Sequence, residues 1–422
     1  MFDDAQLCLI AIYETGNKLA RCRLSSWKFT GSPQLHKPTI AGSARSSSVN
    51  KPPTNICVVL PSPIGYSETF LQAHVDKLGA AVSYLENFPI DVNAEFSMPG
   101  PLDQTEQLKR RMRIAWHRYV MNPKKNIHVR KFFKSNNIGV VLAEYGLTGA
   151  GVLDGCKDLK IPLVVHFHGY DAYSKVVLER YKESYKKMFA YASAIIAVSR
   201  HMTEQLIKLG APREKVFYNA YGVDTTKFGH GCRPASNKQV LAVGRFVEKK
   251  APYLTILAFV KVLKRLPEAK LVMVGSGTLH DVCRNLINSL HIEGSVELKA
   301  MLSHDEVAEV MRRSRVFVQH SLVPASGDCE GTPVAVLEAA VSGLPVVSTR
   351  HTGIVDAVIE GQTGFLVNEG DIDSMAEYIY LLLSDPARAA QMGKRARGYI
   401  TQKFSLEGSI KSLRDILEKC SL

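Results

Sequence analysis

Two carboxylic acids, Glu330 and Glu338, flank a predicted helix start in the segment Gly327–Glu338. Threonine can cap the first turn of a helix and proline is tolerated at its first position, so the pair Thr332–Pro333 predicts that start. A glycine before it lets the backbone approach a ligand closely. The positive end of a helix binds phosphate groups. We therefore expect a diphosphate site, with Glu338 near a ribose and Glu330 near a sugar; its backbone is formed by Gly331, Thr332, Pro333 and Val334.

Two basic residues follow the run Val240–Val243, which has the character of a buried strand. Arg245 and Lys250 would then lie on a loop between a strand and a helix. Cations in such a loop could neutralise the charge that develops on a departing diphosphate. Isolated basic residues are usually surface residues, so their position after a strand is what favours this interpretation.

A third polar group, His166–Asp171, follows the apolar run that begins at Leu163. In parallel sheets, residues at the carboxyl end of a central strand face the ligand crevice. His168 and Asp171 are therefore candidates for the acceptor side, and the alternative is a structural histidine at a strand end. We expect His166 to be structural.

Short apolar runs alternate with helical stretches throughout the chain after Asn55, and this alternation is typical of parallel sheets covered by helices. The helical stretches include Ser67–Leu85, Val176–Ala192 and a terminal helix over Leu406–Leu417. The first set of predicted strands is Ile56–Leu60, Gly139–Leu142, Leu163–Phe167, Ala194–Val198 and Lys215–Tyr218. The second set is Val240–Val243, Lys270–Val274, Ser295–Leu298, Val316–Gln319, Pro345–Ser348 and Gly364–Val367.

These elements predict an α/β protein with two Rossmann-like, doubly wound domains and a cleft between them. A polar stretch over Thr225–Lys238 separates the two sets of strands. We expect four parts: an extension with a flexible linker over 1–53, a first Rossmann-like domain over 54–225, a second over 238–400, and a terminal helix that packs back over 401–422.

Taken together, these segments resemble the retaining glycosyltransferases of family 4, which have the GT-B fold. The resemblance rests on Glu330–Glu338, on Arg245 with Lys250 and on His168–Asp171, and it extends from about Asn55 to Leu417. It implies that Glu330 contacts the transferred sugar, Glu338 the ribose, and Arg245 and Lys250 the diphosphate. It also implies that His168 lies near the reacting sugar, so that His168 and Glu330 are the candidate catalytic residues, and that the reaction retains the anomeric configuration. The domain over 54–225 would then be the acceptor side, and the domain over 238–400 would bind the nucleotide sugar.

The loop with Gly65 and Ser67 resembles the donor–acceptor loop of members that build polysaccharides such as colanic acid and amylovoran. The resemblance therefore implies polysaccharide biosynthesis and a glycan or lipid-linked acceptor. The sequence departs from the family at Ala251–Pro252, where a glycine usually follows the lysine. Two further departures, Val355 and Asp356, lie in His351–Asp356, which resembles the family's His-x-Gly-Ile-Pro-Glu segment.

The composition is that of a soluble globular protein, with 46% hydrophobic and 22% charged residues in 422. An acidic start, the absence of a long apolar run and scattered cysteines predict a cytoplasmic protein with reduced thiols. Neither a zinc motif nor an acidic cluster suggests a metal, so we expect no cofactor apart from the nucleotide-sugar substrate. Gly275–Gly277 is too short for an NAD motif.

The formal net charge of +13 favours an anionic partner. A basic stretch with interleaved aromatic residues, Lys109–Lys134, could bind the anionic inner face of a membrane or could be a solvated helix face. Two other functions stay open: a nucleotide-sugar epimerase of the same fold, and a non-catalytic protein that binds nucleic acid or other anions. The sequence does not identify the base of the donor, the sugar, the acceptor or the linkage.

Overall fold

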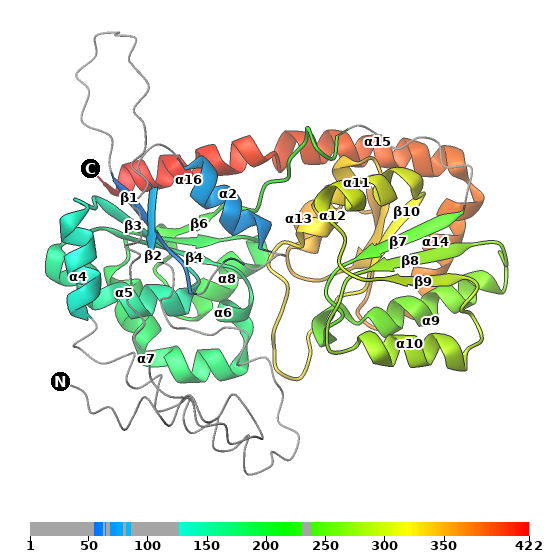
Figure 1. The fold of residues 1–422 in the computed structure, drawn as a ribbon, viewed down its shortest axis with the longest axis horizontal. Coiled ribbons are helices and arrows are strands. Elements are labelled where there is room, and N and C mark those ends of the chain that lie inside the picture. Colours follow the sequence, from blue (N-terminus) through cyan, green and yellow to red (C-terminus); the bar gives the residue numbers. More distant parts are fainter. Residues whose placement is uncertain are drawn as a thin grey trace, which may run out of the picture. The chain divides into compact units, whose positions relative to one another are not determined.

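The computed structural model describes residues 55–61, 64, 68–78, 82–85, 126–229 and 238–421. The predicted extension over 1–53 lies outside these residues, as do Gly65, Ser67 and the part of the basic stretch before Asn126. The described residues form two parallel six-stranded sheets with helices packed on them (Figure 1). The prediction of an α/β protein is therefore confirmed.

The first sheet has the strand order β2-β1-β3-β4-β5-β6. Its central strands are buried along their whole length, which explains their continuous apolar runs. The strands are β1 (Ile56–Val59), β2 (Val82–Leu85), β3 (Val140–Glu144), β4 (Leu163–Phe167), β5 (Ala194–Ala197) and β6 (Val216–Tyr218).

One predicted helix is wrong in its second half. The stretch Ser67–Leu85 contains a helix only over α2 (Thr69–Lys77), and Val82–Leu85 is the edge strand β2, parallel to β1. Gly79 interrupts the helical pattern in the sequence, and the valine and tyrosine that follow favour a strand. The predicted helix was therefore too long, and it included the residues of one strand.

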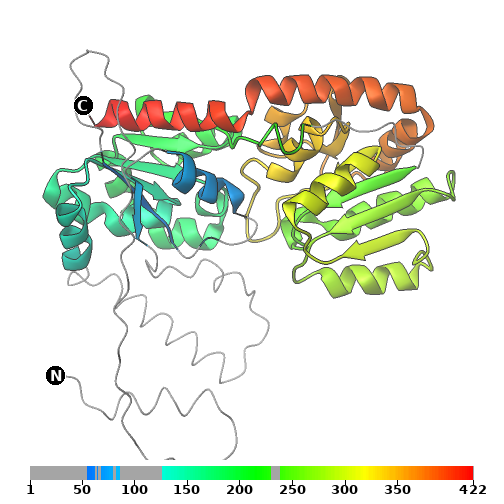
Figure 2. The ribbon, with the colours of Figure 1, turned by 45° about the horizontal axis from the view of Figure 1, so that its top comes forward.

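Helices cover both sides of the first sheet. In Figures 1 and 2, α5 (Gly146–Leu159) lies on one side of it and the terminal helix α16 (Leu406–Cys420) on the other. Both helices contact β3 and β4. The remaining helices of this part are α4 (Asn126–Ser135), α6 (Tyr170–Tyr173), α7 (Lys175–Tyr191), α8 (Arg200–Lys208) and the 3₁₀ turn η3 (Arg213–Lys215).

The second sheet has the order β12-β11-β10-β7-β8-β9, and each of the six predicted runs after Lys238 overlaps one of its strands. Its strands are β7 (Gln239–Val243), β8 (Lys270–Val274), β9 (Val296–Lys299), β10 (Val316–Gln319), β11 (Val346–Thr349) and β12 (Gly364–Val367). Its helices are η4 (Glu248–Lys250), α9 (Pro252–Leu263), α10 (His280–Ser289), α11 (His304–Arg313), α12 (Val334–Val341), α13 (Ile354–Ala357), α14 (Ile372–Ser384) and α15 (Pro386–Lys403). The domain limits given above stay predictions.

The terminal helix α16 packs on the first sheet although it follows the second in the chain (Figure 2). It buries Ile410, Leu413, Ile416 and Leu417 in the core shared with that sheet. Arg414 also donates hydrogen bonds to the carbonyl oxygens of Lys77 and Leu78 at the end of α2. This apolar stripe at helical spacing holds the end of the chain on the first sheet.

The described end of the basic stretch is the helix α4. Its apolar residues Val129 and Phe133 are buried in the protein, and Arg130 pairs with Asp158 of α5. Among the described residues, no helix is long and apolar enough to cross a membrane. Binding of Lys109–Lys134 to an anionic membrane therefore stays a prediction that concerns mainly residues outside the described part.

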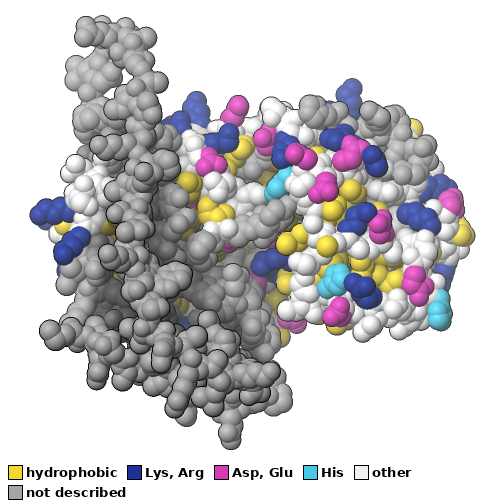
Figure 3. All heavy atoms as spheres, viewed as in Figure 1, with side chains coloured by type: hydrophobic (Ala, Val, Ile, Leu, Met, Phe, Trp, Pro, Cys, Tyr) yellow, Lys and Arg dark blue, Asp and Glu magenta, His cyan; other side chains and the backbone are white. Residues whose placement is uncertain are grey.

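Acidic and basic side chains are mixed on the described surface drawn in Figure 3. Long single-sign fields, which bind nucleic acid, are not seen on that face. The described cysteines, Cys57, Cys156, Cys283, Cys329 and Cys420, are all free thiols.

Candidate active site

The centre of the candidate site is an ion pair at the carboxyl ends of the strands of the second sheet. Lys250 follows β7 through η4, and its Nζ lies 3.0 Å from Glu330 Oε2. Ala251, the residue that replaces the usual glycine, has a φ of +36°. This conformation is unfavourable for alanine, but Ala251 is the N-cap of α9, which still begins at Pro252, two residues after Lys250. The departure from the family therefore leaves the lysine in the site.

Glu330 is buried and ionised. Burial alone would raise its pKa, but Lys250, Lys249 and Arg245 together lower the pKa to about 2. Its second oxygen, Oε1, is buried and has no hydrogen-bond partner among the described residues. One oxygen is thus held by Lys250, and the other is available for a hydroxyl group.

A second ion pair supports the loop that carries Glu330. Lys249 Nζ lies 2.9 Å from Asp328 Oδ1, and both side chains are about nine-tenths buried. Lys249 pairs with Asp328, and its neighbour Lys250 pairs with Glu330. Two consecutive lysines thus form ion pairs with two acidic residues of the same loop. The sequence pattern predicts a role in the site for Lys250 but not for Lys249.

The backbone of Glu330 is held by a histidine whose tautomer follows from its partners. The Glu330 N–H donates to His351 Nε2 at 3.2 Å, so this nitrogen must be unprotonated. The proton of a neutral ring is then on Nδ1, which lies 2.6 Å from Glu369 Oε1. Glu369 therefore orients His351, and His351 positions the Glu330 loop. Glu369 was not predicted, and its only signal is its position just after β12.

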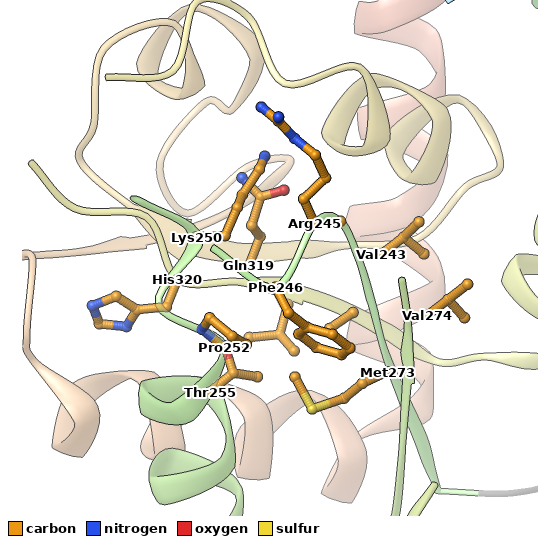
Figure 4. Close-up of a pocket in the computed structure, with 13 residues that line it drawn as sticks. Val243, Arg245, Phe246, Lys250, Pro252, Thr255, Met273, Val274, Gln319 and His320 are labelled. Atoms are coloured by element: carbon orange, nitrogen blue, oxygen red, sulfur yellow. The ribbon is translucent and has the colours of Figure 1, made fainter. Parts of the chain in front are cut away.

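A pocket at the ends of β7, β8 and β10 adjoins the ion pair (Figure 4). Arg245, Lys250 and Gln319 extend to the same side of these strands, away from Phe246 and Met273. Gln319 Oε1 is buried without a hydrogen-bond partner among the described residues. The pocket thus combines cations, which suit an anionic group, with an unsatisfied acceptor, which suits an N–H or O–H group of the same ligand.

Glu338 lies on α12, and its carboxyl group is buried. Burial raises its pKa to about 7, and Lys227 lowers it in part. His304 Nδ1 is 3.8 Å away from Glu338 Oε1. A carboxyl group with this pKa changes charge near neutral pH, so its binding properties should depend on pH.

The predicted helix start needs a correction. The helix α12 begins at Val334, Pro333 is its N-cap, and no side chain caps it. Thr332 does not cap this helix, because its hydroxyl donates to the carbonyl oxygen of Val198 after β5. The threonine therefore connects the loop before α12 to the first sheet.

The strand end at His168 lies against the Glu330 loop. A Cβ atom on Gly331 would lie 2.4 Å from the His168 carbonyl oxygen, and one on Gly169 would lie 2.8 Å from the Cys329 carbonyl oxygen. Gly169 also has a φ of +137°. Only glycine fits such an approach, so these two glycines bring the two loops together.

Asp171 organises the strand end rather than facing outward. Its carboxylate is fully buried and accepts hydrogen bonds from the backbone N–H groups of Gly146, His168 and Gly169. It thereby fixes the loop that carries His168. Its predicted contact with an acceptor stays a prediction.

Both ring nitrogens of His168 are occupied. Nε2 lies 2.8 Å from Glu144 Oε2, and Nδ1 lies 2.6 Å from the Tyr221 hydroxyl. Burial lowers the pKa of His168 to about 3, so the ring is neutral. A neutral ring that faces the ionised Glu144 carries its proton on Nε2, and Tyr221 then donates to Nδ1.

A further contact between the two parts of the chain involves Asp356, a departure from the family pattern. Asp356 of α13 accepts a hydrogen bond of 2.8 Å from the backbone N–H of Arg200, the first residue of α8. A carboxylate suits the positive end of a helix. The aspartate therefore has a structural role of its own.

These features define a two-sheet α/β protein with a cationic pocket at the strand ends of its second sheet. Residues 94–227 match the family described as Glycosyltransferase Family 4, and residues 226–399 match Glycosyl transferases group 1. The chain therefore belongs to the group 1 and family 4 glycosyltransferases, as the amylovoran biosynthesis glycosyltransferase AmsK of Erwinia amylovora also indicates. AmsK is 30% identical over 286 residues, which cover 66% of this chain and 70% of AmsK.

Two further comparisons agree with this family and with the fold. The putative colanic acid biosynthesis glycosyltransferase WcaL of Escherichia coli K12 is 30% identical over 284 residues, 66% of this chain and 70% of WcaL. The crystal structure of Anabaena HepE in complex with UDP has a TM-score of 0.70 at 17% identity, and the match covers 87% of this chain and 100% of HepE. The GT-B fold that the sequence predicts is thus confirmed.

The structure brings most of the predicted residues together. Lys250, Glu330 and the pocket residue Arg245 share one charged cluster, because Lys250 pairs with Glu330 and both cations lower the pKa of this carboxylate. His168 lies next to Gly331 through its backbone, while its ring points into a separate buried cluster. Gly65 and Ser67 lie outside the described residues.

Proposed function

We propose that this protein is a retaining, metal-independent glycosyltransferase that uses a UDP- or GDP-sugar and builds an exopolysaccharide. The proposal draws on its relatives, since AmsK is named for amylovoran biosynthesis and WcaL for colanic acid biosynthesis. The acceptor would be a glycan or a lipid-linked sugar. The base of the donor stays open, although HepE was solved with UDP.

The observation that carries this proposal is the Lys250–Glu330 ion pair of 3.0 Å beside the pocket that Arg245 lines. Lys250 and Arg245 would stabilise the negative charge that develops on the departing nucleoside diphosphate. The free oxygen of Glu330 would accept a hydrogen bond from a hydroxyl of the transferred sugar. Glu338 would bind the ribose, and the backbone from Gly331 to Val334 would contact the phosphates.

Retention would follow from attack on the same face as the leaving group. The bond between the anomeric carbon and the phosphate oxygen breaks, while the acceptor oxygen forms a bond to that carbon. The acceptor's proton passes to an oxygen of the departing diphosphate. The positive charge of Lys250 and Arg245 supplies the stabilisation for which other enzymes use a metal ion.

A thermal-shift screen tests the proposal. Wild-type protein is mixed with UDP, GDP, ADP and their sugars, next to Glu338→Ala and the exposed control Glu293→Ala. We expect the nucleotide and the nucleotide sugars of one base to raise the melting temperature of the wild type and of the control by several degrees. The same compounds should leave the melting temperature of Glu338→Ala unchanged. No stabilisation of the folded wild type by any of these compounds would contradict a nucleotide-sugar site here.

A further inference from the structure

A buried cluster at the strand ends of the first sheet has no role in the proposed transfer. Its centre is Glu144, the last residue of β3, and it includes His74 of α2 and His166 of β4. One ligand-type atom from each of these three residues lies within 4.8 Å of the other two. All three side chains are at least 97% buried.

We propose that His74, Glu144 and His166 bind one divalent transition-metal ion of the zinc class. Two imidazoles and a carboxylate are a ligand set that such ions prefer. This site is separate from the diphosphate pocket of the second sheet, and it does not depend on the transferase chemistry.

The distances within the cluster suit coordination. His74 Nδ1 lies 2.8 Å from Glu144 Oε1, and His166 Nδ1 lies 3.4 Å from Glu144 Oε2. At an ion about 2.1 Å from each ligand, atoms this far apart would subtend angles of about 84° and about 108°. These angles lie near the octahedral and tetrahedral values.

The ring of His166 gives an independent reason for a ligand. Among the described residues, no group makes a well-formed hydrogen bond with either of its nitrogens, although the ring is almost fully buried. A buried imidazole that makes no well-formed hydrogen bond is unfavourable, and a metal ion would satisfy it.

The charge of the cluster points in the same direction. Glu144 is fully buried, and its two oxygens lie 2.8 Å from His74 Nδ1 and 2.8 Å from His168 Nε2. Its ion-pair partners in the described part of the chain are His74, His166 and His168, and none is a lysine or an arginine. A buried carboxylate needs a compensating charge, which a divalent cation would supply.

The surroundings resemble the outer shell of a metal site. His168 donates from Nε2 to Glu144, and Tyr221 donates in turn to His168 Nδ1. Carboxylate ligands are commonly held by such hydrogen bonds. The ion would therefore fix the ring of His168, and with it the loop that contacts Gly331.

Elemental analysis of the metal content tests this proposal. The chain is produced without a histidine tag in medium with added Zn²⁺ and is freed of loose metal by gel filtration. We expect about one zinc ion per chain in the wild type and in the exposed control Glu407→Gln, and less than about 0.2 in Glu144→Gln. His166→Gln serves as the second variant if Glu144→Gln does not fold.

Refolding gives a second measurement. The wild type is unfolded in denaturant that contains a chelator and is then refolded with Zn²⁺, with Co²⁺ or without metal. We expect a higher melting temperature after refolding with either ion than after refolding without metal. Fewer than about 0.1 ions per chain after refolding with both metals would overturn the proposal. Equal zinc in the wild type and in both variants would overturn it too, because the ion would then bind elsewhere. The UDP and GDP shifts are recorded on the same samples, so that a failed metal site and a failed donor site are told apart.

Discussion

Polar residues lie at the carboxyl ends of the strands in both sheets, but their hydrogen bonding differs between the two sheets. In the second sheet, Glu330 keeps one buried oxygen unsatisfied, and Gln319 does the same in the adjoining pocket. In the first sheet, both ring nitrogens of His168 are bound within the protein. The Glu330 carboxylate and the Gln319 amide at the second sheet are thus open to a ligand, whereas the ring of His168 is part of an internal network.

Polar residues can contribute to an active site in two ways, by direct contact with a ligand or by positioning the backbone around it. Glu330 and Lys250 would act by direct contact with the donor. His168 and Asp171 would act through the backbone, since Asp171 binds three N–H groups and the His168 carbonyl oxygen closely approaches Gly331. The comparison predicts that variants in the second sheet change donor kinetics, and that variants in the first sheet change mainly stability.

Removal of the Lys250 charge should have the largest effect. Lys250→Met keeps much of the volume of the side chain, but the diphosphate loses a cation in a buried site. We expect kcat/KM for the nucleotide sugar to fall about 100-fold to about 1000-fold. Steady-state kinetics with the donor found in the thermal-shift screen would measure this change.

The control for this variant is Lys261→Met, because Lys261 is exposed and pairs with Asp373 on α14. Its kinetics should equal those of the wild type. If Lys250→Met stayed within about threefold of the wild type, the charged pocket would not carry the transfer.

The strands of this fold were largely predictable, and the buried networks were not. Runs such as Leu163–Phe167 are apolar along their whole length because both faces of the strand are covered. The edge strand β2 was missed, since an amphipathic pattern at an edge is easily mistaken for a helix. Local sequence thus specifies central strands better than edge strands.

The site was predictable only where its residues share a short segment. Glu330 and Glu338 are separated by one loop and part of one helix, and Lys250 follows a recognisable strand. Glu144 and His74, by contrast, are 70 residues apart, and the three-dimensional fold alone brings them together. Glu369 was missed for the same reason, because its partner His351 lies on another loop.

The second prediction concerns the pH dependence of donor binding. Glu338 has a raised pKa of about 7, and its ionised form is the better acceptor for two ribose hydroxyls. Between pH 6 and pH 8 its ionised fraction rises from about 9% to about 91%, so affinity for the donor should increase about tenfold. Isothermal titration calorimetry with the intact nucleotide sugar is suitable, since its diphosphate does not titrate in this range.

The control here is Glu338→Gln, in which the charge can no longer change. Its affinity should be nearly constant between pH 6 and pH 8. An equal increase in both proteins would assign the pH dependence to another group and would remove Glu338 from ribose binding.

The smallest effect should come from Tyr221→Phe, and it tests the other side of the comparison. The variant removes the hydroxyl that donates to His168 Nδ1 and leaves a buried acceptor unsatisfied, so the free energy of unfolding should fall by about 1 kcal/mol. Urea denaturation would measure this, with Tyr378→Phe as the control because the Tyr378 ring stacks on Phe365 far along the chain from His168. Donor affinity should be unchanged, since the hydroxyl faces His168 and not the charged pocket. A tenfold loss of donor affinity at unchanged stability would instead show that the ring of His168 acts on the donor, and the contrast between a Glu330 carboxylate that is open to a ligand and a His168 ring that is bonded within the protein would be wrong.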